Sequence, residues 1–154
     1  MNPSFPLKPL LDLTQTRMDD AARRLGQLIA SEQEGTRKLE LLQNYRAEYE
    51  TRFHDAARNG MSPEAWRNYA SFLGRIDEAV AVQAAAVARS RDLTVAGQEA
   101  WTEQRNKVKA FDTLQKRFDA GEARKAAKQE QRASDEYAAK RHRDRNDADD
   151  AAAP

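Results

Sequence analysis

The fold is decided at residues 59–64, which read Asn-Gly-Met-Ser-Pro-Glu. Gly60 can adopt the left-handed backbone conformation that ends a helix, and Ser62 can cap the next helix. Pro63 suits the first position of that helix, and Glu64 complements the positive end of its dipole. This stretch predicts a turn at 59–63 between a helix that ends near residue 58 and one that begins near residue 64.

The positions of the prolines leave room for two long helices on either side of this turn. Prolines stand at positions 3, 6, 9, 63 and 154, and none lies inside 10–62 or 64–153. A proline in a helix interior costs about 3 kcal/mol. Their absence from these two stretches therefore permits two uninterrupted helices.

Apolar residues recur in both segments at alternating steps of four and three. Eleven of 15 such positions are apolar from Leu7 to Ala56, and ten of 16 are apolar from Trp66 to Phe118. This period, held over many turns, is typical of a coiled coil, and the short turn makes the two helices antiparallel. We predict an all-α fold, a long antiparallel two-helix coiled-coil hairpin over 7–118. A compact helical bundle would need shorter helices and more turns.

The position of the turn also predicts which residues face each other. Residue numbers of paired seam positions should add up to roughly 122. Phe53 then faces Tyr69, and Ala21 faces Trp101. A small residue against a large one is a common way to fill a layer between helices.

A polar layer interrupts the seam near its middle. Glu32 and Gly35 fall opposite Ser90 and Val87, and either of the arginines next to Ser90, Arg89 or Arg91, could reach Glu32. A buried polar residue can fix the register of a coiled coil. The layer could equally be a soft, bendable part of the hairpin.

The two ends of the chain differ from the paired region. Residues 1–6 are expected to form an N-terminal extension, 119–145 a charged helical overhang, and 146–154 a disordered, aspartate-rich tail. Residues 116–145 contain ten basic and six acidic side chains. This overhang could bind acidic protein, anionic lipid or RNA, or it could be a solvated helix with internal ion pairs.

Composition argues against several classes of function. The net charge is +1, which gives no overall case for nucleic-acid binding. Cysteine is absent, no apolar run could span a bilayer, and the N-terminus does not resemble a secretion signal. Neither His54 nor His142 has a histidine, cysteine or acidic partner at a metal-ligand spacing that its context supports. We therefore expect no catalytic, cofactor-binding or metal-binding residues, since a two-helix hairpin has no cavity for a reaction.

Several apolar residues close to the turn lie off the seam and are expected to be exposed. Tyr45 and Phe72 fall on adjoining parts of the hairpin. Aromatic residues gathered on an exposed face favour a protein-binding surface, although they could also form a third row that broadens the seam. With the seam residues Leu42, Tyr49 and Ile76, and with Ala79, Tyr45 and Phe72 form one contiguous patch close to the turn, named here the gate patch.

Five short motifs follow one another along the chain in a fixed order. They are Asp19-Asp20-Ala21-Ala22-Arg23-Arg24-Leu25-Gly26, Leu42-x-x-Tyr45-x-x-x-Tyr49, Trp66-x-x-Tyr69-x-x-Phe72, Lys109-Ala110-Phe111-Asp112-Thr113-Leu114 and Asp135-Glu136-Tyr137-Ala138. Together they resemble the FliJ family of flagellar export proteins between about Pro6 and Arg143. Tyr137 stands where a phenylalanine is commoner in the family, and Gly35 and Gly97 weaken the seam.

The resemblance implies a role in flagellar type III secretion. It implies a cytoplasmic stalk, associated peripherally with the inner-membrane flagellar base, that enters the hexameric ring of the export ATPase FliI. It also implies contact with the export gate protein FlhA and, as further candidate partners, FliH and substrate-specific export chaperones. Nucleic acid is not among the partners it implies.

The resemblance also suggests residues for each contact. Lys38 and Gln83 would join the gate patch in contacting FlhA. The residues expected to meet the ATPase ring are Leu7, Leu11, Leu13, Arg23, Arg24, Trp101, Phe111 and Leu114.

Two other functions stay open at the level of sequence. The first is a coiled-coil adaptor or tether of another system, such as an injectisome or a scaffold. The second is a membrane-surface or nucleic-acid binder that uses the basic overhang. Each would use the same hairpin.

Overall fold

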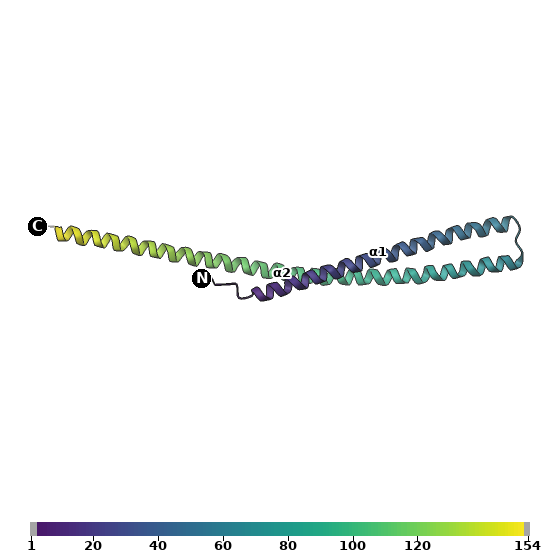
Figure 1. Ribbon diagram of the computed structural model, residues 1–154, viewed down its shortest axis with the longest axis horizontal. Coiled ribbons are helices and arrows are strands. Elements are labelled where there is room, and N and C mark those ends of the chain that lie inside the picture. Colours follow the sequence, from purple (N-terminus) through teal and green to yellow (C-terminus); the bar gives the residue numbers. More distant parts are fainter. Residues whose placement is uncertain (1–2, 153–154) are drawn as a thin grey trace. The chain divides into compact units, whose positions relative to one another are not determined.

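A computed structural model describes residues 3–152 and contains, in that range, two α-helices and the turn between them (Figure 1). Helix α1 spans Lys8–Arg58 and helix α2 spans Pro63–Ala152. The two helices pack against each other, which confirms the predicted all-α hairpin. Contacts divide the chain into a hairpin unit, Gln15–Asn106, and a terminal unit, Met1–Thr14 with Lys107–Pro154.

The turn has the capping interactions that its sequence predicts. Gly60 adopts a φ of 93°, in the left-handed region that favours glycine. The Ser62 hydroxyl accepts a hydrogen bond from the Ala65 N–H at 3.1 Å, and the Ser62 carbonyl accepts one from the Trp66 N–H at 2.9 Å. Pro63 is the first residue of α2. The chain thus ends one helix and begins the next within a few residues.

The seam of the hairpin unit follows the predicted register. The rings of Phe53 and Tyr69 lie 5.7 Å apart between centroids, and the Thr94 hydroxyl lies 3.4 Å from the Leu28 carbonyl oxygen. In both pairs the residue numbers add up to about 122. Val87 is the most deeply buried side chain of this seam, with 2% of its surface exposed.

The polar layer contains specific contacts between the helices. Arg91 Nε lies 3.5 Å from Glu32 Oε1, so Arg91 is the arginine that reaches Glu32. The Gln83 amide donates a hydrogen bond of 3.0 Å to the Gly35 carbonyl. The layer is therefore held by polar groups as well as by Val87. That it fixes the register stays a prediction.

Gly97 fits the seam because it leaves room for a neighbouring side chain. A Cβ atom at this position would lie 2.7 Å from Leu28 Cδ1, which is too close for two carbon atoms. The leucine side chain therefore packs directly over the glycine backbone. A Cβ on Gly35, by contrast, would lie at an ordinary contact distance of 3.5 Å from Val87 Cγ2.

Two glycine substitutions on α2 should therefore differ in effect. Nothing lies within 4 Å of a Cβ placed on Gly74. Gly74→Ala should raise the free energy of unfolding by about 1 kcal/mol, the usual preference for alanine over glycine within a helix. Gly97→Ala should raise it less, because Leu28 must move. Urea denaturation of both variants measures this, and an equal gain at both positions would contradict the packing at Gly97.

The terminal unit includes a contact that the sequence did not predict. Phe5 lies in the segment expected to be only an extension, yet it is 9% exposed, and its ring centroid lies 5.6 Å from that of Phe118. Leu11, Thr14 and Val108 are buried in the same unit. The buried apolar contacts of the terminal unit therefore include Phe5, which precedes α1 in the chain. The aromatic ring adds apolar burial there.

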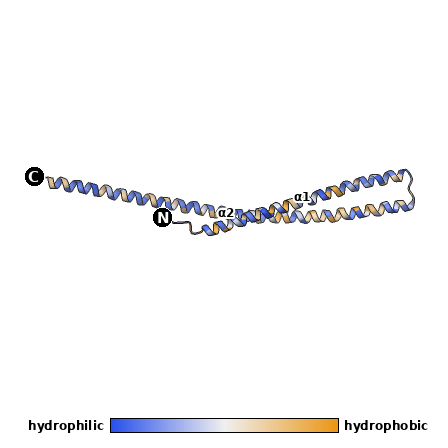
Figure 2. Cartoon of the chain, in the orientation of Figure 1, coloured by the Kyte–Doolittle hydropathy of each residue, from blue (hydrophilic) through white to orange (hydrophobic). Residues whose placement is uncertain are grey.

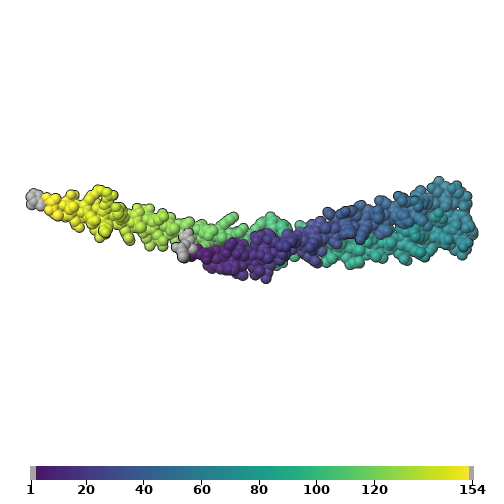
Figure 3. All heavy atoms as spheres, viewed as in Figure 1, coloured from purple at the N-terminus to yellow at the C-terminus, as the bar shows by residue number. Residues whose placement is uncertain are grey.

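The C-terminal part of α2 continues beyond its contacts with the N-terminal segment. Residues 119–145 are helical as predicted, and the side chains of 123–152 are all exposed. The helix also includes 146–152, where we expected a disordered tail, while 153–154 lie outside the described residues. Alanines at 148, 151 and 152 favour helix. Hydrophilic residues dominate this stretch (Figure 2), which runs on beyond the atoms of the N-terminal segment (Figure 3).

Candidate protein-binding surfaces

The gate patch is built around a cluster of aromatic rings contributed by both helices. Tyr49 of α1 lies at the centre, with its ring centroid 4.7 Å from that of Phe72 and 5.4 Å from that of Tyr69. Tyr45, one turn earlier on α1, contacts Phe72 edge-on at 6.5 Å. The cluster forms because spacings of three and four residues place these side chains on facing sides of the two helices.

Exposure divides the gate patch into supporting and accessible residues. Ile76 is only 6% exposed and belongs to the core of the seam. Tyr49 and Phe72 are half-buried, and burial raises the pKa of the Tyr49 phenol above its usual value, with Tyr69 and Tyr45 adding to the effect. Tyr45 is 43% exposed and presents its ring to solvent. A partner would therefore meet Tyr45 before the residues that support it.

Leu41 extends this accessible surface, although the sequence analysis did not place it in the gate patch. Its side chain is 71% exposed. Together with Leu42, Asn44, Tyr45 and Glu48 it lines a shallow hollow on α1. The signal was present in the sequence, because Leu41 is an apolar residue off the seam and one turn before Tyr45.

The other residues predicted to contact the export gate differ in how free they are to bind a partner; they are Ala79, Lys38 and Gln83. Ala79 is exposed, and Lys38 forms an ion pair with Glu34 at 3.6 Å. Gln83 is half-buried, and its amide is already hydrogen-bonded to Gly35 between the helices. Gln83 therefore contributes first to the contact between the helices.

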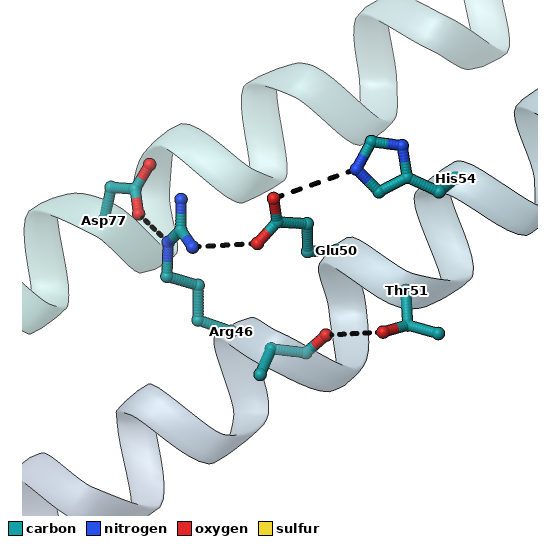
Figure 4. A network of polar contacts seen from close by, with 6 residues as sticks. Arg46, Glu50, Thr51, His54 and Asp77 are labelled. Carbon is teal, nitrogen blue, oxygen red and sulfur yellow. Dashed lines mark hydrogen bonds and ion pairs between the residues drawn. The ribbon is translucent and has the colours of Figure 1, made fainter.

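A network of polar side chains links α1 and α2 (Figure 4), and two of its members, Arg46 and Glu50, are next to Tyr45 and Tyr49 in the sequence. Arg46, at a seam position of α1, forms ion pairs with Asp77 of α2 and, at 2.9 Å, with Glu50. Glu50 also lies 3.8 Å from His54. The hydrogen bond and charge of Asp77 raise the pKa of Arg46 above its usual value. The guanidinium thus joins the helices at their surface instead of filling the seam.

The residues predicted to meet an ATPase ring fall in both units. In the hairpin unit, Arg23 and Arg24 are exposed, and Arg23 pairs with Asp20 at 3.2 Å. Trp101 is half-buried, and the Arg105 guanidinium lies 5.3 Å from the centroid of its ring. These contacts leave Arg24 as the more available of the two adjacent arginines.

In the terminal unit, some of the residues predicted to meet the ATPase ring are buried and others are exposed. Leu11 is 6% exposed and belongs to the core, while Leu7 and Phe111 are half-buried. Leu13 and Leu114 are 47% and 41% exposed. Leu10, which the sequence analysis did not select, is also exposed. The accessible apolar surface of this unit therefore consists largely of leucine side chains.

Two other kinds of site are not found within residues 3–152. No group of three or more histidine, cysteine, aspartate or glutamate side chains there could hold a metal ion. Neither helix, over its described length, has an apolar stretch long enough to cross a membrane.

Comparison with known proteins gives consistent matches over most of the chain. The model of one family, described as Flagellar FliJ protein, matches residues 3–147. The Flagellar FliJ protein of Salmonella typhi is 27% identical over 132 residues, and that of Escherichia coli (strain K12) is 25% identical over 132. Each alignment covers 86% of this chain and 90% of the relative.

A solved structure shares the fold. It is that of a proposed YscO homologue from Chlamydia trachomatis, which matches with a TM-score of 0.55 at 15% sequence identity. The match covers 92% of this chain and 96% of the other. At this identity the likeness concerns the fold alone.

Proposed function

Since this chain belongs to the Flagellar FliJ protein family and is thus a component of flagellar protein export, we propose that it is a stalk-like coiled coil that binds two parts of the export apparatus. One is the ring of the export ATPase FliI, and the other is the export gate protein FlhA. By binding both it promotes export of flagellar proteins, and it catalyses no reaction itself. The family match over residues 3–147 carries this proposal, and it favours the flagellar system over an injectisome or scaffold adaptor.

The gate contact is assigned to the surface around Tyr45. Exposed aromatic and large apolar side chains are the usual anchors of protein interfaces. Tyr45 and Leu41 are accessible, and the ring cluster of Tyr49 and Phe72 holds Tyr45 in place. Such a preorganised anchor loses little conformational entropy when a partner binds.

The ring contact is assigned to the exposed residues of the predicted set. Leu13 and Leu114 offer apolar contact, and Arg24 offers a charge. Leu7, Leu11 and Phe111 would contribute indirectly, by packing between the two helices and holding the exposed residues in position. The chain would then work in the cytoplasm and reach the membrane only through its protein partners, with FliH and export chaperones as further candidates.

Titration into the cognate FliI tests the ring contact. We expect the wild-type chain to promote ring assembly and raise the rate of ATP hydrolysis. Leu13→Asp combined with Leu114→Asp should raise the concentration needed for half-maximal effect about tenfold or more, a loss of about 1.4 kcal/mol. Leu93→Asp, at a 54% exposed leucine of the hairpin unit, should change little. A wild-type chain that alters neither assembly nor hydrolysis would refute the ring contact.

A further inference from the structure

The C-terminal part of α2 presents a long exposed helical surface, and within the described chain Pro3 shares a hollow with Ala123 and Ala126 at its beginning. All side chains of residues 123–152, named here the free end, are exposed. Tyr137 is the one large hydrophobic side chain exposed within the described free end, at 68%, and it lines a shallow hollow with Lys140, Arg141 and Asp144. A helix that is polar on all sides gains little from burial alone, so its charges decide what it can pair with.

Two segments of the free end carry net charges of opposite sign, and the stretch between them carries two acidic side chains and three lysine or arginine side chains. Residues 124–132 carry a net charge of +3 and residues 144–150 a net charge of −3. Tyr137 lies midway between the two segments. Among the charged side chains of these two segments, Lys125 is the one that forms an ion pair in the described chain, with Glu122. The first segment contains Arg124, Lys125, Lys128, Glu130 and Arg132, and the second contains Asp144, Arg145, Asp147, Asp149 and Asp150.

This arrangement is complementary to itself when reversed. If a second free end lies antiparallel, with the two Tyr137 side chains near the centre, each basic segment faces an acidic one. A parallel pairing would place like charges together, which is unfavourable. A two-fold interface requires one surface to fit a copy of itself. A register centred on Tyr137 places Arg124 opposite Asp150 and Lys125 opposite Asp149, and these two pairs outnumber the one like-charged pair, Glu130 opposite Asp144.

We propose that two copies of this chain associate antiparallel through their free ends, residues 123–152, with Tyr137 at the two-fold axis. The pairing uses none of the residues assigned to the gate or to the ATPase ring. It therefore goes beyond the proposed role in export and can fail without affecting that role.

Cross-linking tests the pairing and its direction, because the chain has no cysteine of its own. Tyr137→Cys chains should be joined efficiently by a short bismaleimide. Ala127→Cys chains should not be joined, since two copies of residue 127 would lie about 30 Å apart at 1.5 Å per residue. An equal mixture of Ala127→Cys and Ala148→Cys chains should be joined, because residue 127 faces residue 147, next to Ala148, and both chains keep Tyr137.

Charge exchange provides an independent test by sedimentation of the full chain. The association should weaken as salt rises. Lys125→Glu with Lys128→Glu should weaken dimer formation at least tenfold, and adding Asp147→Lys with Asp149→Lys should restore it. Cross-linking of Ala127→Cys alone, or an Ala127→Cys and Ala148→Cys mixture that stays unjoined, would overturn the proposal. So would a quadruple variant that stays monomeric. Each variant should still stimulate FliI, which separates this test from that of the ring contact.

Discussion

Replacing Val87 with aspartate is expected to lower the free energy of unfolding by about 3 kcal/mol or more. Val87 is 2% exposed and packs opposite Gly35 in the seam. An aspartate there would lose the apolar contacts and would place a carboxylate where little water reaches it. The melting temperature, followed by circular dichroism, should fall by roughly 10 °C or more.

Val82→Asp is the matched control for this substitution. Val82 lies on the same helix but is 68% exposed. Its replacement should change the free energy of unfolding by about 0.5 kcal/mol or less. Equal losses at the two positions would contradict the seam that the structure assigns to α2.

Removal of two accessible side chains from α1 is expected to disrupt binding to the export gate. Leu41→Ala with Tyr45→Ala should weaken binding of the chain to FlhA about 30-fold or more, equivalent to roughly 2 kcal/mol for the loss of an interface anchor. Leu41 is 71% exposed and Tyr45 43%, and neither belongs to the buried core of the seam, so helicity and melting temperature should change little. Binding can be measured by isothermal titration calorimetry with the soluble part of FlhA.

Val95→Ala is the control for the gate experiment. Val95 is 59% exposed and lies outside the gate patch. Its replacement should leave FlhA binding unchanged. Normal FlhA binding by the Leu41→Ala and Tyr45→Ala double variant would remove the gate contact from this surface. A large fall in its melting temperature would show instead that these residues support the hairpin.

The turn and the register could be predicted from sequence because both depend on local rules. Gly60, Ser62 and Pro63 have strong positional preferences, and a turn placed there fixes the pairing of every later layer. The contacts of Phe53 with Tyr69 and of Leu28 with Thr94 follow from that single register. Arg91 was also one of the two arginines expected to reach Glu32.

The features of the structure that differ from the sequence-based expectations depend on contacts outside the periodic apolar pattern. Phe5 lies among prolines and breaks the repeat, so its packing against Phe118 could not be deduced from spacing. Residues 146–152 were expected to be disordered because of their aspartates, but the alanines among them favour helix. Gly97 was expected to weaken the seam, whereas it leaves room for Leu28.

The candidate surfaces were predictable only in outline. Sequence spacing brought Tyr45 and Phe72 together, and the structure places their rings in contact. Sequence spacing could not predict that the Gln83 amide donates a hydrogen bond to the Gly35 carbonyl. Nor could it predict that Leu41 is more exposed than Tyr45. Such differences depend on the direction in which each side chain points from its helix. A repeat of apolar residues does not specify that direction in enough detail.

The central claim is that one chain binds the ATPase ring and the export gate with different residues. Sedimentation of the full chain mixed with FliI and the soluble part of FlhA tests it most directly. We predict a complex that contains all three proteins. It should lose FlhA when Leu41 and Tyr45 are replaced by alanine, and lose FliI when Leu13 and Leu114 are replaced by aspartate. Mutually exclusive binding, in which FlhA displaces the chain from FliI, would contradict the claim.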